Sequence, residues 1–266
     1  MNFERIASAP DLQKFVECYW CAESDDKTPH AKKIIPDGYP EFVFHYGDPY
    51  RISLDGTWEW QTPDLVGGQL QKFFYVENSG VTGTFGLTFK PTALTHLFDI
   101  NMETLTGRVS CLRETISGME QFQSEIIQSG SMEQRIKTAE TFIRKFIKSD
   151  PAEHIVDKAL DILRSREGLI PIQELCDQVS IGDRQLQRLF QRYVGVAPKF
   201  YARVIRFNKI FKMIRTTGTT RADIVYASGY YDQSHFTRNF KSFTGEDSTA
   251  FAFEKPTMTN FFAYKS

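Results

Sequence analysis

Two segments near the C-terminal end of the chain repeat one pattern of side chains that suits DNA bases. Arg188 and Gly195 in the first segment correspond, 50 residues later, to Arg238 and Gly245 in the second. Arginine donates two hydrogen bonds to guanine, glutamine pairs similarly with adenine, and threonine contacts the methyl group of thymine. These residue types occur in the repeat, which therefore predicts two elements that read DNA.

The first segment is expected to form the second helix of a helix-turn-helix unit. Apolar residues at helical spacing predict a helix over 172–179, a turn over 180–182 and a second helix over 183–193. Leu186 and Phe190 face the core, which leaves the polar side chains of this helix outward. The predicted DNA contacts of the first unit are Arg184, Gln187, Arg188, Gln191 and Arg192.

The second segment is expected to complete a similar unit. Residues 224–228 form a short helical pattern, and Gly229 provides the turn. Asp232 is suited to cap a helix over 233–243, in which Phe236 points inward. The predicted DNA contacts of the second unit are Gln233, Ser234, Thr237, Arg238 and Lys241.

The two units are joined by a predicted helix that begins at Pro198. Its apolar stripe consists of Phe200, Val204, Phe207, Phe211 and Ile214. A rigid helix buried along this stripe would hold the two reading helices at a fixed separation. Successive major grooves on one face of the duplex lie about 34 Å apart, and this arrangement would suit them.

The charge of the chain is divided between its two halves. The whole sequence carries 32 basic and 33 acidic residues, but residues 151–266 have a net charge of +5 and residues 1–150 have −6. From Arg184 to Arg221 there are ten basic residues and no Asp or Glu. Such an unequal distribution of charge is typical of a protein in which one half binds a polyanion and the other half has a different role.

The first 100 residues predict a β-rich domain. Alternating apolar and polar residues indicate strands around 41–46, 57–61 and 84–90, separated by turns that include 36–38 and 67–68. This pattern is typical of an antiparallel sandwich or a small barrel.

Helical spacing follows the strands, and it extends to the predicted domain boundary. Helices are expected around 94–98, 122–126 and 132–146, the last of which we expect to pack on its own domain. Asp150 is suited to cap the first helix of the next domain. The predicted divisions are a domain over 1–149, a second over 150–255 and a tail over 256–266.

From about residue 157 to 253 the chain resembles the C-terminal domain of the AraC/XylS family of bacterial transcription regulators. The matching segments are 186–190, 195–201, 206–207 and 223–241. The resemblance implies an all-α domain of two helix-turn-helix subdomains joined by one helix, which binds promoter DNA. Gly182 stands where the family usually has a capping Ser, and Asp247-Ser248 replaces its Ser-Pro. We therefore expect weaker capping after Gly245.

The N-terminal half is similar to an uncharacterised sensor-like domain found fused to this type of DNA-binding domain. The similarity lies in residues 35–44 and 85–91. It implies a β-rich, cupin-like module that binds an effector or mediates dimerisation, with flanking helices. The expected fold class of the whole chain is therefore α+β.

Four N-terminal side chains are candidates for binding an effector. Glu41 and His45 lie on the strand face opposite Phe44, where they could line a pocket, and Trp58 and Trp60 could stack on a ligand. A structural histidine and ordinary aromatic packing are the commoner explanations for such residues. The sequence contains no phosphate-binding loop and no clustered metal ligands, so we expect no cofactor and no metal.

These observations predict a transcription regulator that binds specific DNA sequences and responds to a small molecule. One alternative is a DNA-targeted enzyme using Cys18, Cys21 or Cys111, but none has a neighbouring basic cluster to activate its thiol, so we expect no enzyme. Another is a regulator whose first half only dimerises. Candidate partners are double-stranded promoter DNA, RNA polymerase, an effector and a second copy of the chain. No apolar run spans a membrane, and we expect a cytoplasmic protein.

Overall fold

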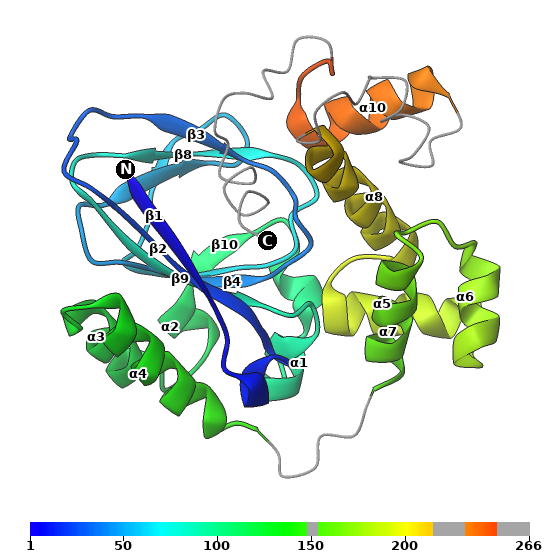
Figure 1. Ribbon diagram of the computed structural model, residues 1–266, viewed down its shortest axis with the longest axis horizontal. Helices are drawn as coiled ribbons and strands as arrows, with labels where there is room; N and C mark the ends of the chain where they lie inside the picture. The colour runs from blue at the N-terminus through cyan, green and yellow to red at the C-terminus, as the bar shows by residue number, and fades with distance from the viewer. Residues whose placement is uncertain (148–153, 215–231, 249–266) are drawn as a thin grey trace.

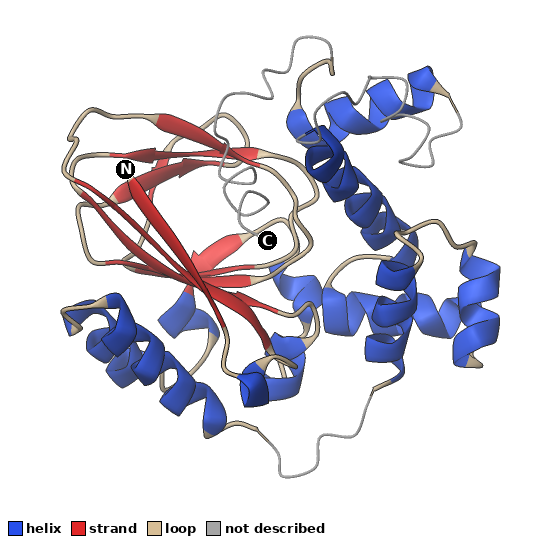
Figure 2. Cartoon of the chain, in the orientation of Figure 1, coloured by secondary structure: helices blue, strands red, loops and turns tan. Residues whose placement is uncertain are grey.

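The structure is a computed structural model, and it describes residues 1–147, 154–214 and 232–248 (Figure 1). Figure 2 shows strands gathered in the N-terminal part and helices alone in the C-terminal part. The α+β fold class predicted from the sequence is confirmed. The tail over 256–266, the first helix of the second unit over 224–228 and the capping residue Asp150 lie outside the described residues.

The strands form two antiparallel sheets. One has the order β1-β2-β9-β4-β7-β10 and the other the order β3-β8-β5-β6. The strands of the first sheet are β1 (Asn2–Ala7), β2 (Val16–Ser24), β9 (Thr82–Phe89), β4 (Glu41–His45), β7 (Asp64–Gly67) and β10 (Val109–Cys111). Those of the second are β3 (Ala31–Ile34), β8 (Phe74–Asn78), β5 (Tyr50–Ser53) and β6 (Glu59–Trp60).

The outer face of the first sheet is covered by helices and forms the main core. Phe42 and Phe44 of β4 are buried on this face, and the Phe44 ring meets the Phe122 ring edge-on at 5.5 Å. Ala139 and Ile143 belong to the same core, so the helix predicted to pack on its own domain does so. The helical elements of this domain are η1 (Pro10–Leu12), α1 (Ala93–Phe98), η2 (Met102–Leu105), α2 (Leu112–Thr115), α3 (Glu120–Gln128) and α4 (Met132–Arg144).

Two details of the predicted strands were wrong. The strand expected over 57–61 is only the short edge strand β6, because Trp58 and Trp60 are exposed and no buried face holds a longer strand in place. Gly67, expected in a turn, ends β7, where it pairs with Glu41 of β4.

The C-terminal helices of the first unit form the predicted helix-turn-helix. They are α5 (Ile155–Ser165), α6 (Ile172–Val179) and α7 (Asp183–Val194). The first of these is capped by His154, whose ring accepts from the chain while Asp157 accepts from the His154 N–H. Ser180 ends α6 in a left-handed conformation, with φ at 57°, which turns the chain toward α7.

A long helix joins this unit to the next, as the sequence predicts. It is α8 (Pro198–Ile214), and the second reading helix is α10 (Gln233–Thr244). Tyr201 and Ala202 of α8 lie in the core of the first unit, whereas Val204, Phe207 and Ile210 lie in the core of the second. The side chains of Phe211 and Ile214, which complete the predicted stripe, lie outside the described residues.

Candidate nucleic-acid interface and ligand cavity

The first reading helix presents a polar face to solvent. Leu186, Phe190 and Val194 of α7 are fully buried, which fixes the rotation of the helix. Arg184, Gln187, Arg188 and Arg192 are exposed and Gln191 is half-buried. The structure therefore places all five predicted contacts of the first unit on the surface of one helix. Gly182 caps this helix without a side-chain bond, as the sequence predicts.

The C-terminal end of α7 rests on the N-terminal domain. Arg192 forms an ion pair with Asp99 at 2.8 Å, immediately after α1. Thr106 donates a hydrogen bond of 2.5 Å to the carbonyl oxygen of Gly195, whose left-handed φ of 92° ends the helix. Arg192 is thus partly engaged within the chain, while Arg184 and Arg188 form no ion pair among the described residues.

The second reading helix is built in the same way. Asp232 accepts a hydrogen bond of 2.7 Å from the backbone N–H of His235, which caps α10. Phe236, Phe240 and Phe243 are buried. Gln233, Ser234, Arg238 and Lys241 are exposed, and Thr237 is half-buried.

Packing against α8 fixes the second reading helix relative to the first. The Phe207 ring lies 5.6 Å from the Phe240 ring and 4.8 Å from the Phe243 ring. Figure 1 shows α7 near one end of α8 and α10 near the other. One helix thus joins two helices that each have a polar, exposed face, and their fit to successive grooves of DNA stays a prediction.

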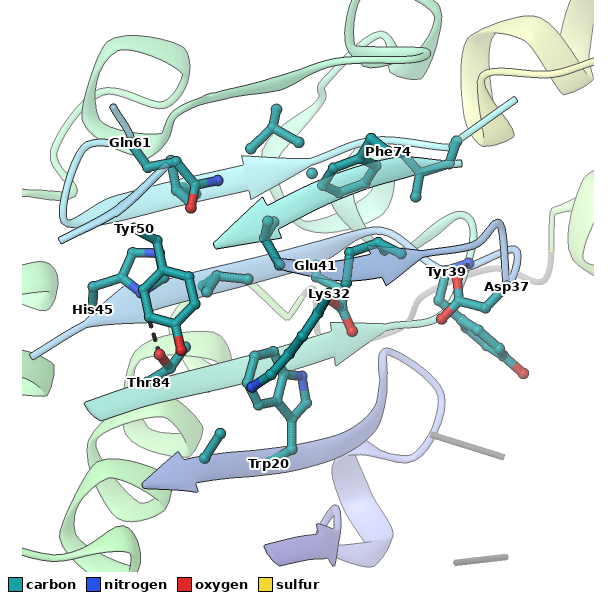
Figure 3. A pocket seen from close by; sticks show the side chains of 18 of the residues that line it. Trp20, Lys32, Asp37, Tyr39, Glu41, His45, Tyr50, Gln61, Phe74 and Thr84 are labelled. Carbon is teal, nitrogen blue, oxygen red and sulfur yellow. Dashed lines mark hydrogen bonds between the residues drawn. The ribbon is translucent and has the colours of Figure 1, made fainter. Parts of the chain in front are cut away.

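A second candidate site is a cavity of about 120 Å³ between the two sheets of the N-terminal domain (Figure 3). Most of its walls are apolar, including Trp20 of β2 and Phe74 of β8. Its other lining residues are Ala22, Lys32, Ile34, Ile35, Asp37, Tyr39, Glu41, Val43, His45, Tyr50, Gln61, Leu65, Gly67, Gly68, Leu70, Val76, Thr84 and Val109. Apolar walls with a few convergent polar groups are typical of small-molecule sites.

Alternation along β4 brings two predicted residues into this cavity. Glu41, Val43 and His45 point to the cavity, while Phe42 and Phe44 point to the helices on the other face. Both side chains therefore line a cavity wall, which is one of the two placements expected from the sequence. Effector binding by these residues stays a prediction.

The His45 ring is buried and neutral. Its Nδ1 shares a hydrogen bond of 3.2 Å with the Thr84 hydroxyl, and the ring stacks on Tyr50 at 4.8 Å. Burial lowers the pKa of His45 to about 4, an effect that nearby Gln61 opposes only in part. Nε2 has no hydrogen bond of good geometry within the described part of the chain. A polar atom on the cavity wall is therefore open to a ligand.

Two carboxyl groups lie at the other end of the cavity. Glu41 accepts a hydrogen bond of 2.6 Å from the Thr88 hydroxyl, and Asp37 accepts one of 3.0 Å from the Tyr39 backbone N–H. Burial raises the pKa of Glu41, and the neighbouring Asp37 carboxylate raises it further. Burial also raises the pKa of Asp37. Neither carboxylate forms an ion pair among the described residues.

The floor of the cavity depends on a glycine. A Cβ atom at Gly86 of β9 would lie 2.0 Å from the Trp20 indole, so only glycine lets this ring lie across the strand. Trp20 thereby closes one side of the cavity beside Ala22 of the same strand.

The two other predicted effector residues lie apart from this cavity. Trp60 is 66% exposed on β6, and Trp58 is 37% exposed with its ring 4.9 Å from the Arg51 guanidinium. The structure does not bring either tryptophan to the cavity wall, where Trp20 contributes the indole instead. Trp20 and Ala22 are two residues apart on β2 and therefore share one strand face, and this spacing is the signal that could have identified the wall.

The loop that closes the cavity also contacts the DNA-binding half. Asn208 of α8 donates a hydrogen bond of 2.7 Å to the carbonyl oxygen of Asp37. Ile35 lines the cavity and is buried in the core of the second unit, with Phe207 and Phe240. The sequence pattern indicates a turn at residues 36–38 and does not reveal this connection, because its partners lie more than 160 residues away.

A polar cluster provides another contact between the halves. Asp157 of α5 accepts hydrogen bonds from Thr92 at 2.5 Å and pairs with His96 at 2.9 Å. His154 stacks on Tyr193 at 4.0 Å beside this cluster.

Neither a metal site nor a membrane span is found in what the structure describes. No three His, Cys, Asp or Glu side chains come together as metal ligands within the ranges 1–147, 154–214 and 232–248. No helix in these same ranges is both long enough and apolar enough to cross a bilayer.

Comparisons with known proteins fit this division of the chain. The profile of a helix-turn-helix domain matches residues 175–252, and that of a domain of unknown function, DUF6597, matches residues 4–110. The transcriptional regulator GbdR of Pseudomonas aeruginosa is 26% identical over 76 residues, which are 29% of this chain. The chain thus spans about a fifth of the length of the curated relatives it matches, or 21%.

A solved structure has a similar fold over the whole chain. It is ToxT from Vibrio cholerae, with a TM-score of 0.50 and 10% identity over 99% of this chain and 98% of that one. At this identity the likeness concerns the fold alone. It covers both the β-rich domain and the helical domain.

Replacing Arg188 or Arg238 by alanine is expected to weaken binding to a specific operator by about 1–3 kcal/mol, because each guanidinium can bind a base edge from an exposed helix face. Fluorescence anisotropy on operator and random DNA measures the loss. Lys137→Ala removes one charge from an exposed position on α4 and is the control. An equal loss on random DNA would show that these arginines contact phosphates instead of bases.

The free energy of unfolding is expected to fall as the pH drops from about 6.5 to about 4, since the folded chain resists protonation of His45. The unfolded state takes up the proton first, so stability is full above this window and lost within it. His45→Gln should remove up to about 3 kcal/mol of this pH dependence, measured by urea unfolding. His30→Gln, at an exposed site, is the control. Parallel pH profiles for wild type and His45→Gln would contradict the assignment.

Proposed function

We propose that this chain, in which a helix-turn-helix domain follows a β-rich domain, is an AraC-type transcription regulator controlled by a small molecule in the β-domain cavity. The observation that carries this proposal is the pair of reading helices, α7 and α10, with polar outward faces on one connecting helix. Exposed Arg and Gln on both helices supply the base contacts, and the basic stretch from Arg184 to Arg221 supplies contacts to phosphates.

Control by a ligand is supported by the path from the cavity to the second unit. Ile35 contributes to the cavity wall and to the core around Phe207. The next residues are held against α8, because Asn208 bonds to the Asp37 carbonyl and Tyr201 lies against Gly38. A ligand that moves this loop therefore changes the packing that orients α10.

A neighbouring contact joins the second helix-turn-helix unit to strand β3 of the second sheet. The buried Lys33 amine of β3 donates a hydrogen bond of 2.8 Å to the Thr244 carbonyl at the end of α10, and it also pairs with Glu246. Because Ile34 and Ile35 follow directly and line the cavity, one short segment contacts both the ligand site and the reading helix.

The alternatives have less support. A reactive cysteine needs a lowered pKa, but burial raises the pKa of Cys18 and of Cys21. A first half that only dimerises predicts a filled β-core, whereas the two sheets enclose a cavity of about 120 Å³. We therefore favour a non-enzymatic regulator with a ligand site.

The remaining partners belong to this proposal as predictions. Promoter DNA is the main partner, and RNA polymerase and a second copy of the chain are the candidates for protein partners. A protein of this kind acts where the chromosome lies, which agrees with the cytoplasmic location expected from the sequence.

The proposal is tested by titrating promoter fragments from the host genome with the full chain. We expect a specific complex whose affinity falls by about a thousandfold between about 50 and about 200 mM salt, as six phosphate contacts would give. Absence of binding on every promoter fragment, or binding indifferent to salt, would overturn the regulator assignment.

Asp99→Asn is expected to tighten DNA binding about two- to fivefold, because it releases Arg192 for a phosphate or a base and removes a negative charge beside α7. Asparagine also accepts the left-handed backbone of residue 99, with φ at 54°. The same anisotropy titration measures the change. Glu103→Gln removes an exposed acid from nearby η2 and is the matched control. Equal effects of the two substitutions would mean that overall charge, not release of Arg192, is responsible.

A further inference from the structure

We infer that the cavity binds a cationic amine with an apolar body, whose ammonium group lies between Glu41 and Asp37 and whose far end reaches His45. This inference rests on the proposed function, since it names the chemical class of the effector. Figure 3 shows His45 and Glu41 along one strand, with Asp37 beyond Glu41.

Among the described residues, no cation forms an ion pair with either carboxyl at the acidic end of the cavity. Arg5, which acts on both carboxyls, forms an ion pair with Glu17 at 3.6 Å, and Glu17 also pairs with Lys90. Asp37 and Glu41 repel each other across the cavity end, which raises the pKa of Glu41. An ammonium group placed there would remove this repulsion and replace lost hydration with charge-assisted hydrogen bonds.

Few titratable or charged groups act on this pair of carboxyls. The titratable and charged groups that act on Glu41 are Asp37, Arg5 and Cys18. Those that act on Asp37 are Arg5, Glu17, Glu41, Tyr39 and Tyr201. Arg5 is the one cation in these two sets, and it also contacts Cys18 and Glu17.

The residues in the middle and at the far end of the cavity indicate the chemistry and size of the rest of the ligand. Val43 lies between Glu41 and His45 on β4, and Leu65, Phe74 and Val76 face the same space from neighbouring strands, so the body of the ligand is apolar. The neutral His45 ring, buried with Nε2 open on the cavity wall, offers one hydrogen bond. A volume of about 120 Å³ is close to that which holds a benzene-sized group.

Lys32 is the group that would favour an anion instead. Its amine reaches Met1 at the exposed edge of the domain, where it lies 2.7 Å from the sulfur atom. Glu41 of β4 and Asp37, in the loop held by Asn208 of α8, line the cavity, and neither pairs with Lys32 among the described residues. We therefore place the charged group of the ligand at the two carboxyls.

Binding also moves a proton. Without a ligand, the raised pKa of Glu41 keeps part of the population protonated near neutral pH. An ammonium group favours the ionised carboxylate, so Glu41 releases its proton to solvent when the amine binds. The affinity for an amine should therefore rise with pH, by at most about tenfold per pH unit.

The test uses calorimetry on the full chain with three probes of one shape. They are tyramine, its alcohol analogue tyrosol, and the carboxylate of the same chain length, para-hydroxyphenylpropionate. We expect tyramine to bind at least about tenfold more tightly than either analogue, with release of a proton detected by comparing buffers. Glu41→Gln should remove about tenfold or more of the tyramine affinity and its pH dependence, while tyrosol changes little.

Matched variants separate the possible outcomes. Asp37→Asn removes the other carboxylate from the acidic end of the cavity. Glu59→Gln removes an exposed carboxylate on β6 and is the control. Val76→Trp fills the cavity and should abolish binding of every probe.

Tighter binding of the carboxylate probe, with loss of that binding in Lys32→Met, would overturn the amine assignment and leave the effector function standing. Absence of tyramine binding also overturns it, while the promoter titration tests DNA regulation independently.

Discussion

Burial of one helix in two cores is the constraint on which the arrangement of the C-terminal half depends. The first part of α8 packs into the core of the first unit through Tyr201 and Ala202, and the later part packs into the second through Phe207 and Ile210. Interiors packed at this density transmit displacement because they contain little free volume. Neither reading helix can therefore change its direction without altering the packing around α8.

The N-terminal domain uses the two faces of one sheet for different purposes. The face of β4 that carries Phe42 and Phe44 packs against helices and supplies the core. The opposite face, with Glu41 and His45, is left partly empty under the second sheet. The packed core and the cavity wall are separated in this way by the two-residue period of a strand. The polar side chains on the cavity face cost stability unless a ligand or water satisfies them.

Local patterns in the sequence were enough to predict most of the fold and part of the site. The spacing of Phe236, Phe240 and Phe243 fixed the rotation of α10, and the alternation through Phe44 placed His45 opposite the core. The pairing of Arg192 with Asp99 and the double role of Ile35 could not be predicted, because both depend on contacts between distant segments. The exposed Trp60 shows a second limit of sequence patterns. Alternating residues predict a strand, but they do not show whether either face of that strand is covered by the rest of the protein.

Ile35 lines the cavity and also packs in the core beneath α10. This shared residue affects how the protein would bind its effector while it is bound to DNA. Coupling free energy between two sites is reciprocal, so whatever factor the ligand imposes on operator affinity, the operator imposes on ligand affinity. Protein molecules bound to a promoter would then bind the effector over a different range of concentrations from molecules that are not bound to DNA. Under the proposed function, DNA is therefore an allosteric ligand of the β-domain.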